Sequence, residues 1–245
     1  MHSRFRVASV VALSLLATAG VGHAQQADSV ATKGPLPGRG GIGGQVGGTY
    51  MFAESDYSEG SQPRLSFTGH FRYVINKRWG WQFSPSFTWN GYVSHADAPF
   101  VDANFPNEGV SKQFYLTQVL GVSSQLQWYT GTGRSRWHLG AGPAMYRVVV
   151  QNHRKVVEDP LTHELHDGLH MGAVGELGVE HFLKRLPNTS LELTASWQAA
   201  FAKSDGRWQT GWNGNPMLAE LRFGGHYYYD FRKPKPKSTK PGLGR

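Results

Sequence analysis

The sequence predicts an all-β fold, an eight-stranded antiparallel up-and-down β-barrel whose strands cross a membrane. Three observations lead to this prediction. Eight segments alternate between apolar and polar residues, the connections between them are alternately short and long, and an export signal precedes the first segment. Because successive side chains of a strand point to opposite faces, each segment is expected to form a strand with one apolar and one polar face.

The alternation is clearest in residues 64–90. Most odd-numbered positions from Leu65 to Ile75, and again from Trp79 to Trp89, are apolar, whereas polar residues or glycine fill most even-numbered positions. A tight turn at residues 76–78 joins the two arms. Each arm has about ten residues, which is long enough to cross a bilayer at a tilt. The eight predicted strands are, in order, residues 41–52, 64–75, 79–90, 114–129, 137–149, 170–182, 189–201 and 217–231.

The connections between these strands alternate in length. Short links occupy residues 76–78, 130–136 and 183–188. The longer links are polar and rich in Gly, Pro, Asn and Asp, and they occupy residues 53–63, 91–112, 150–169 and 202–216. Short periplasmic turns on one side and long extracellular loops on the other are typical of an outer-membrane barrel.

A soluble eight-stranded barrel of the lipocalin type is the alternative, because alternation alone does not reveal which face lies inside. Three features favour the membrane: the loop asymmetry, a polar face rich in Gly, Ser and Thr that suits a narrow interior, and aromatic residues near the strand ends. The aromatic residues expected on the short-turn side are Tyr73, Trp79, Trp81, Trp128, Trp137, Tyr229 and Phe231.

The chain divides into four predicted parts. Residues 1–24 read as a cleaved signal peptide, with basic residues at Arg4 and Arg6, a short apolar stretch and small residues before the cleavage point; a membrane anchor is the alternative. Residues 25–40 form a periplasmic lead-in, residues 41–231 the barrel, and residues 232–245 a basic tail rich in proline and lysine.

Charge and cysteine content exclude several functions. The chain has no cysteine, so it forms no disulfide and no thiolate metal site. Its net charge of +8 is matched by the basic residues of the signal peptide and the tail, which leaves the barrel balanced and argues against nucleic-acid binding. The tail is expected to stay extended, either without a partner or attached to anionic lipid or peptidoglycan.

The last predicted strand carries a polar-x-Gly-x-x-aromatic-x-aromatic pattern. Its residues are Arg222, Gly224, Tyr227 and Tyr229, with Phe231 as a further aromatic residue. In this the chain resembles the small outer-membrane β-barrels of Gram-negative bacteria, of the OmpA-domain, OmpX and OmpW type. The resemblance implies insertion by the barrel assembly machinery, a monomer in the cell outer membrane, and contact with its lipid and lipopolysaccharide. One departure is that the chain continues past the terminal aromatic residue.

The polar face carries ionisable residues that should meet inside the barrel. A narrow eight-stranded barrel is filled by its side chains, and buried charges must pair. We expect a salt-bridged plug; a gated ion path is the alternative, and catalysis by these groups is a further one. The predicted interior charge network is Arg64, His70, Arg72, Glu176, Glu180, Glu192, Glu220 and Arg222, and His138, His226 and Asp230 share the same face.

Two further features have both a functional and a structural interpretation. His163, His166 and His170 are candidate metal ligands in the third long loop, but the spacing is one residue short of His-Glu-x-x-His, and a solvated polar loop is the alternative. Pro85 and Pro143 lie in the middle of lipid-facing strand segments, where each removes a ladder hydrogen bond. They mark either a tolerated distortion or a lateral opening, as in the lipid A palmitoyltransferase barrel.

The predicted function is non-enzymatic: an outer-membrane barrel with a plugged polar interior and a structural, envelope or surface-interaction role, without a cofactor. One alternative is a narrow pore or lateral conduit for small apolar solutes, as in OmpW-type barrels. Another is a lipid A-modifying enzyme, against which the sequence lacks the His-x-Ser that lipid A deacylase barrels require.

Overall fold

The computed structural model describes residues 37–54, 61–93, 102–106, 114–131, 133–201 and 213–230. The predicted signal peptide, most of the lead-in, Phe231 and the basic tail lie outside these ranges. Within the described ranges, no helix is long and apolar enough to cross a bilayer. The strands are β1 (Arg39–Glu54), β2 (Ser61–Gln62), β3 (Arg64–Val74), β4 (Trp79–Val93), β5 (Phe114–Thr130), β6 (Ser135–Asn152), β7 (Lys155–Val156), β8 (Asp167–Phe182), β9 (Thr189–Ala200) and β10 (Asn213–Asp230).

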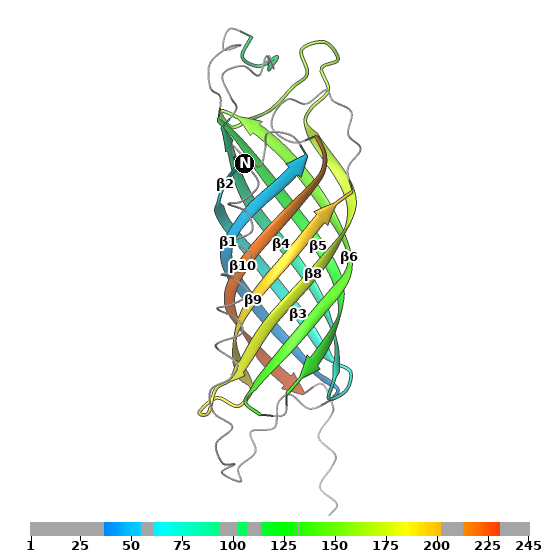
Figure 1. Ribbon diagram of the computed structural model, residues 1–245, viewed down its shortest axis with the longest axis vertical. Helices are drawn as coiled ribbons and strands as arrows, with labels where there is room; N and C mark the ends of the chain where they lie inside the picture. Colours follow the sequence, from blue (N-terminus) through cyan, green and yellow to red (C-terminus); the bar gives the residue numbers. More distant parts are fainter. Residues whose placement is uncertain are drawn as a thin grey trace, which may run out of the picture. The chain divides into compact units, whose positions relative to one another are not determined.

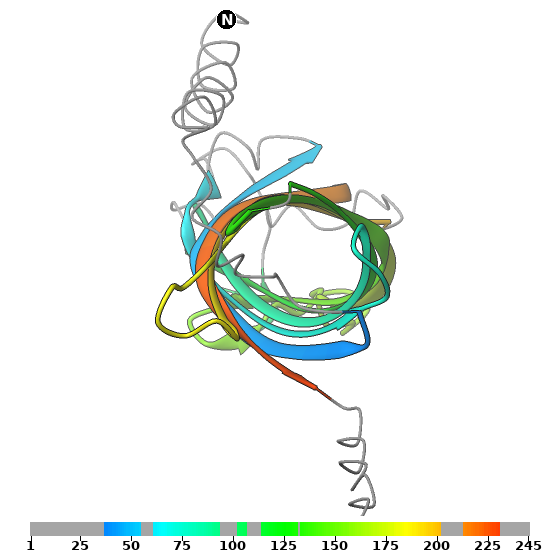
Figure 2. The same cartoon turned by 90° about the horizontal axis from the view of Figure 1, so that it is seen from below.

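Eight of these strands close into an antiparallel barrel. Each long strand pairs with the next in the chain, and β10 pairs with β1 from Arg39 opposite Asp230 to Glu54 opposite Asn213. The tilted strands are visible in Figure 1, and the end-on view in Figure 2 shows the closed ring. Closure leaves no unpaired edge along the sheet, which is what a strand-built membrane protein requires. The predicted fold class is therefore confirmed.

The strand boundaries differ most from the prediction around the third long loop. β6 continues to Asn152 and β8 begins at Asp167, so their ladder reaches Val149 opposite Asp167. The short β7 then pairs back onto the end of β6, and an isolated bridge joins Glu158 to Leu165. This loop is therefore a folded arm rather than the flexible segment that its polar composition implied. The arm rises at the top of Figure 1.

The two faces of the wall have the polarity of a membrane barrel. On β10, Leu221 and Phe223 are more than half exposed on the outside, whereas Glu220 and Arg222 between and beside them are buried inside. The same division is seen on the other long strands. A lipocalin-type barrel would have the reverse arrangement, so the apolar outer face is a surface for lipid.

The interior has two layers. Charged and amide side chains fill the half toward the short turns, whereas an apolar cluster lies among neutral polar side chains such as Asn90 and Thr117 toward the long loops. The buried apolar cluster consists of Met51, Tyr115, Val119, Ala144, Tyr146, Val148, Val150, Val157, Val174, Ala200 and Leu218. The interior toward the long loops is therefore partly apolar, which the prediction of a polar interior did not include. These residues occupy inward positions that the alternation analysis did not use, because their strands carry apolar residues on both faces near the long loops.

Candidate functional site: the interior charge network

The centre of the network is Arg72 on β3, whose side chain is fully buried. Its guanidinium reaches across the barrel to Glu192 on β9, with Nη1 3.0 Å from Oε2 and Nη2 3.2 Å from Oε1. Its Nε donates to Gln82 Oε1 at 2.9 Å. A guanidinium bound to both carboxylate oxygens has its direction fixed as well as its charge compensated. This pair joins strands that are 120 residues apart in the chain.

Glu180 on β8 is the second carboxylate of this centre. Arg136 at the start of β6 donates to its Oε2 at 2.7 Å, and the hydroxyls of Ser190 and Tyr228 donate to its Oε1 at 2.6 and 2.7 Å. The Arg136 guanidinium also lies 3.9 Å from the centroid of the Tyr129 ring. The carboxylate is therefore enclosed by cations, hydroxyls and aromatic rings, which compensate for its removal from water.

A second centre lies around Arg222 on β10. Its Nη2 donates to Glu176 Oε1 at 2.5 Å and its Nη1 donates to Thr68 Oγ1 at 2.7 Å, while Glu220 Oε2 lies 3.4 Å away. Glu220 also accepts from Thr88 Oγ1 at 2.8 Å, across the barrel. The two centres are joined by the amide of Gln82, which donates to Glu176 at 3.0 Å and accepts from Arg72.

Apolar side chains cover the outside of this wall, and bridged charges fill half of its inside. The protein is a transmembrane β-barrel. Its fold is a closed, eight-stranded antiparallel barrel with an apolar outer face.

Comparisons with known proteins give structural neighbours only. No family model and no curated protein matches the sequence. The barrel is similar to Ail of Yersinia pestis in complex with the heparin analogue sucrose octasulfate, with 11% identity, a TM-score of 0.47, and 79% of this chain and 100% of the other covered. It is also similar to Neisserial surface protein A (14%, 0.48, 78% and 97%) and to OprG of Pseudomonas aeruginosa (11%, 0.47, 80% and 98%). Similarities this low carry no information about ligand or activity.

The structure brings seven of the eight predicted network residues together. The exception is Arg64, which is exposed at the start of β3 with its guanidinium 5.5 Å from the centroid of the Phe114 ring. The structure places it on the outer face instead, because the segment from β2 to β3 has one residue more than the part of β4 with which it pairs, as described below. His70 is inside but contacts neutral partners, Ser84 Oγ at 2.9 Å and Gln45 Oε1 at 3.1 Å.

Sequence reasoning missed Arg136, Tyr228 and the amides that link the charges. Arg136 was placed in a short turn, although its position next to the outward Trp137 makes it inward by simple alternation. Tyr228 lies between Tyr227 and Tyr229 of the assembly pattern and was assigned to neither face, whereas its hydroxyl contacts Arg72 and Glu180. Extending the alternation one residue before Trp137 would have found Arg136, and applying it to every position of residues 217–231 would have found Tyr228.

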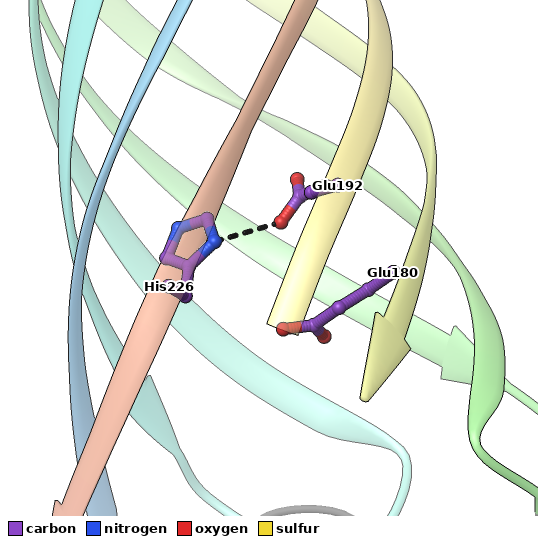
Figure 3. A group of neighbouring side chains, drawn as sticks. All are labelled: Glu180, Glu192 and His226. Carbon is purple, nitrogen blue, oxygen red and sulfur yellow. Dashed lines mark ion pairs between the residues drawn. The ribbon is translucent and has the colours of Figure 1, made fainter. Parts of the chain in front are cut away.

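One group in the network has the composition of a metal site. Ligand atoms of Glu180, Glu192 and His226 lie within 4.8 Å of one another, and Figure 3 shows His226 directed at Glu192, with Nδ1 3.0 Å from Oε2. However, the two carboxylates already bind Arg72 and Arg136. A metal ion would have to displace these guanidinium groups, so the geometry fits a salt-bridged cluster better than a metal centre.

The charges of this interior nearly cancel. Four buried carboxylates (Glu176, Glu180, Glu192, Glu220) face three guanidinium groups (Arg72, Arg136, Arg222). His138 and His226 both lie beside Glu192, at 3.3 and 3.0 Å, without a well-formed hydrogen bond.

The predicted loop metal ligands are not brought together. His163 is exposed and pairs with Glu158 at 2.7 Å, His166 is buried in the arm, and His170 belongs to β8. No group of close metal-ligating atoms in the described residues contains any of the three. The turn around Asp159, whose Oδ1 accepts from two backbone amides, holds His163 away from the barrel wall.

Pro85 and Pro143 each coincide with a gap in a ladder. The β3–β4 pairing passes from Thr68 opposite Ser86 to Phe71 opposite Phe83, so no pair is formed at Pro85. The β5–β6 pairing has the same gap beside Pro143, between Ser123 and Leu126 of β5. On their other sides both prolines stay in continuous ladders. Proline has no N–H to donate, so each of the two prolines interrupts the hydrogen-bonded ladder on one side of its strand and leaves the other ladder intact.

The assembly pattern on β10 serves the fold in two ways. Tyr227 is half exposed on the outer face, and Arg222 belongs to the interior network. At Gly224 a Cβ would lie 2.0 Å from the carbonyl oxygen of Gly44, so only glycine allows β10 to approach β1 this closely. Phe231, the last residue of the pattern, lies outside the described residues.

Proposed function

We propose that the protein is a closed, non-conducting barrel of the Gram-negative outer membrane, with a non-enzymatic role in the envelope or at the cell surface. The observation that carries this proposal is the filled interior. Side chains from opposite walls meet in the two charged centres, as in the pairs of Arg72 with Glu192 and Thr88 with Glu220. Such bridges hold the interior shut and leave the extracellular loops as the parts that contact partners.

The apolar half of the interior supports the same proposal. The cavity found there has a volume of about 10 Å³, which is about enough for a single water molecule. It is lined by Met51, Val119, Tyr146, Val148, Gln198, Ala200 and Leu218. A hydrated ion crossing the barrel would have to pass this layer and then break the charged one.

The described extracellular segments form a fixed surface. Residues 102–106 pack against the arm, where Ala103 N donates to Glu158 O at 3.0 Å and Asn104 Nδ2 donates to Val156 O at 3.0 Å. The Lys155 ammonium lies 5.3 Å from the centroid of the Phe105 ring. Two long connections are thus joined into one platform, which is suited to presenting a surface of constant shape to a partner.

Planar-bilayer recording of the purified full-length protein tests the proposal. We expect flat traces from the wild type. The positive control is a Met51→Ala/Tyr146→Ala/Arg222→Ala variant, which shortens two side chains of the apolar layer and one of the charged layer. This variant is expected to conduct ions. Steady single-channel conductance from the wild type would overturn the proposal.

A lateral conduit for small apolar solutes is the second candidate. The observations that favour it are the ladder gaps at Pro85 and Pro143 and the apolar lining of the interior toward the long loops. If it operates, liposomes that contain the protein should take up an apolar dye faster than empty ones. A Pro85→Val/Pro143→Val variant should slow the uptake, and Pro160→Ala in the exposed turn should not. Equal uptake by all three would remove this candidate.

Insertion by the barrel assembly machinery is proposed on the β10 pattern, and attachment to peptidoglycan or anionic lipid on the basic tail. Deleting residues 232–245 should abolish co-sedimentation with peptidoglycan while leaving the barrel folded. Equal co-sedimentation would end the tethering proposal.

A lipid A mass spectrum that changes on expression would contradict the non-enzymatic assignment.

A further inference from the structure

Arg64 is turned outward by a β-bulge. Gln62 of β2 pairs with Gly91 of β4, and Ser66 of β3 pairs with Thr88 of β4. The chain advances four residues from Gln62 to Ser66 but only three from Thr88 to Gly91, so the segment that joins β2 to β3 contains one extra residue. A bulge of this kind re-aims the side chains next to it. Leu65 is exposed on the outer face and Ser66 is fully buried inside, so the extra residue lies between Gln62 and Leu65.

The contacts of Arg64 place its side chain on the outer face. Its Nε lies 3.4 Å from the position that a Cβ on Gly91 would occupy, and its guanidinium carbon lies 5.5 Å from the Phe114 ring centroid. Gly91 shares the outer face of β4 with Trp89, two residues away. A side chain at Gly91 would also meet the Phe114 ring at 3.0 Å, so glycine leaves the room in which the ring and the guanidinium lie.

Arg64 borders a groove of about 680 Å³ on the outside of the wall. The groove is lined by Pro63, Arg64, Leu65, Trp89, Phe114 and Leu116. Apart from the guanidinium its lining is apolar, and it lies at the ends of β3, β4 and β5 that lead into the long loops. Among the described residues, no carboxylate pairs with Arg64, whereas Arg72, Arg136 and Arg222 inside the barrel all have carboxylate partners.

Two properties of the groove define its occupant. The groove continues the apolar surface that faces lipid, so the molecules that cover it are membrane lipids. A guanidinium at the membrane boundary is stabilised by an anionic phosphate, which it binds through its planar N–H groups. Trp89 and Phe114 have the ring types that occur at the boundary between acyl chains and headgroups.

We propose that this groove binds one phosphate-bearing anionic lipid of the outer leaflet. The phosphate lies at Arg64, and the first acyl chain lies along Leu65, Trp89 and Leu116. The site requires the barrel to lie in a membrane with its long loops outward, as proposed above, but it does not require the interior to be closed. Its test and the conductance test therefore fail independently.

Native mass spectrometry of the full-length protein in detergent, titrated with dioleoyl phosphatidylglycerol, tests the site. We expect one lipid to be retained on the wild type at concentrations at which dioleoyl phosphatidylcholine, with the same chains, is not. Arg64→Gln should weaken retention about tenfold, which corresponds to the loss of one charge-assisted hydrogen bond. Arg64→Lys should keep part of it.

The matched control is Arg78→Gln, which removes an exposed arginine at the opposite, short-turn end and should leave retention unchanged. Glycerol 3-phosphate, which has the charge but no acyl chain, should not compete with the lipid. Equal retention by Arg64→Gln and wild type would overturn the proposal, and so would displacement by glycerol 3-phosphate. Equal binding of the two lipids would show that the groove does not distinguish an anionic headgroup from a zwitterionic one, which also contradicts the proposal.

Discussion

Arg72 shows what one buried residue contributes to this interior. Its guanidinium contacts Glu192 through two nitrogens and lies 3.6 Å from Glu180, and all three side chains are at most 1% exposed. Removing one partner of a buried ion pair leaves the other charged and unsolvated, which costs more than the pair contributes when intact. The stability of the barrel should therefore depend on the balance of these charges more than on any single one.

Arg72→Met is expected to lower the free energy of unfolding by about 3–5 kcal/mol, because it leaves Glu192 uncompensated. The double variant Arg72→Met/Glu192→Leu should recover part of the loss. Urea unfolding in lipid vesicles, followed by tryptophan fluorescence, measures both. The control is Arg147→Gln, which breaks an exposed ion pair with Asp167 and should change the stability little, because solvent screens this pair. Equal losses for the two arginines would contradict the account.

Two neighbouring glycines of β1 provide a second test at this scale. A Cβ on Gly47 would lie 2.1 Å from the carbonyl oxygen of Leu221, whereas the nearest atom to a Cβ on Gly48 is 4.0 Å away. Gly47→Ala should therefore force β1 and β10 apart and reduce the folded fraction in a refolding assay. Gly48→Ala should fold as the wild type does or slightly better, since alanine has less conformational entropy to lose. If both variants refold equally, the close approach at Gly47 is not needed.

At the scale of the strands, the proline gaps interrupt two ladders at similar heights on either side of the β4–β5 pair. Pro85 lies opposite Val122, and the second gap begins beyond Ser123 on the same strand. The β4–β5 ladder between them is continuous from Trp79 to Val93. Each of these two strands therefore has one interrupted ladder, β4 toward β3 and β5 toward β6.

Pro85→Val should close the first gap, because valine supplies the missing N–H and suits a strand. Hydrogen exchange followed by mass spectrometry should then show slower exchange in the peptide that contains Gly69 and His70, with no change in a β8–β9 peptide. Unchanged exchange near Gly69 would mean that backbone curvature, and not the proline, separates the strands.

The strands themselves could be predicted from alternation, because lipid on one side and a narrow interior on the other impose period two on every crossing. Features that depend on pairing could not. The bulge that turns Arg64 outward arises from the register between β2 and β4, which no local pattern contains. Likewise, alternation places Glu180 and Glu192 inside, but only barrel closure decides that Arg72 reaches both. Tyr228 was missed because its neighbours made it look like a lipid-facing aromatic residue.

At the scale of the whole molecule, the interior contains an apolar layer toward the long loops and a charged layer toward the short turns, and the proposed closure rests on both. The two layers have different physical bases, since one excludes water and the other binds its charges to each other. Damage to one should leave the other intact.

Met51→Ala should create a cavity in the apolar layer and cost about 2–5 kcal/mol of stability without opening a conducting path. Denaturant unfolding gives the stability, and bilayer recording gives the conductance. Ion conduction by this single variant would show that the charged layer does not close the barrel alone.

The distance along the chain between the partners of the charge network determines when the barrel can become dry. Arg72 is synthesised early, but Glu192 and Tyr228 follow it by 120 and 156 residues. Until β9 and β10 arrive, the guanidinium has no carboxylate partner on its own hairpin and must stay hydrated. We therefore expect the interior to lose its water only when β10 pairs with β1 and the barrel closes. The strand that carries the assembly pattern thus also brings the last partners of the charge network into place.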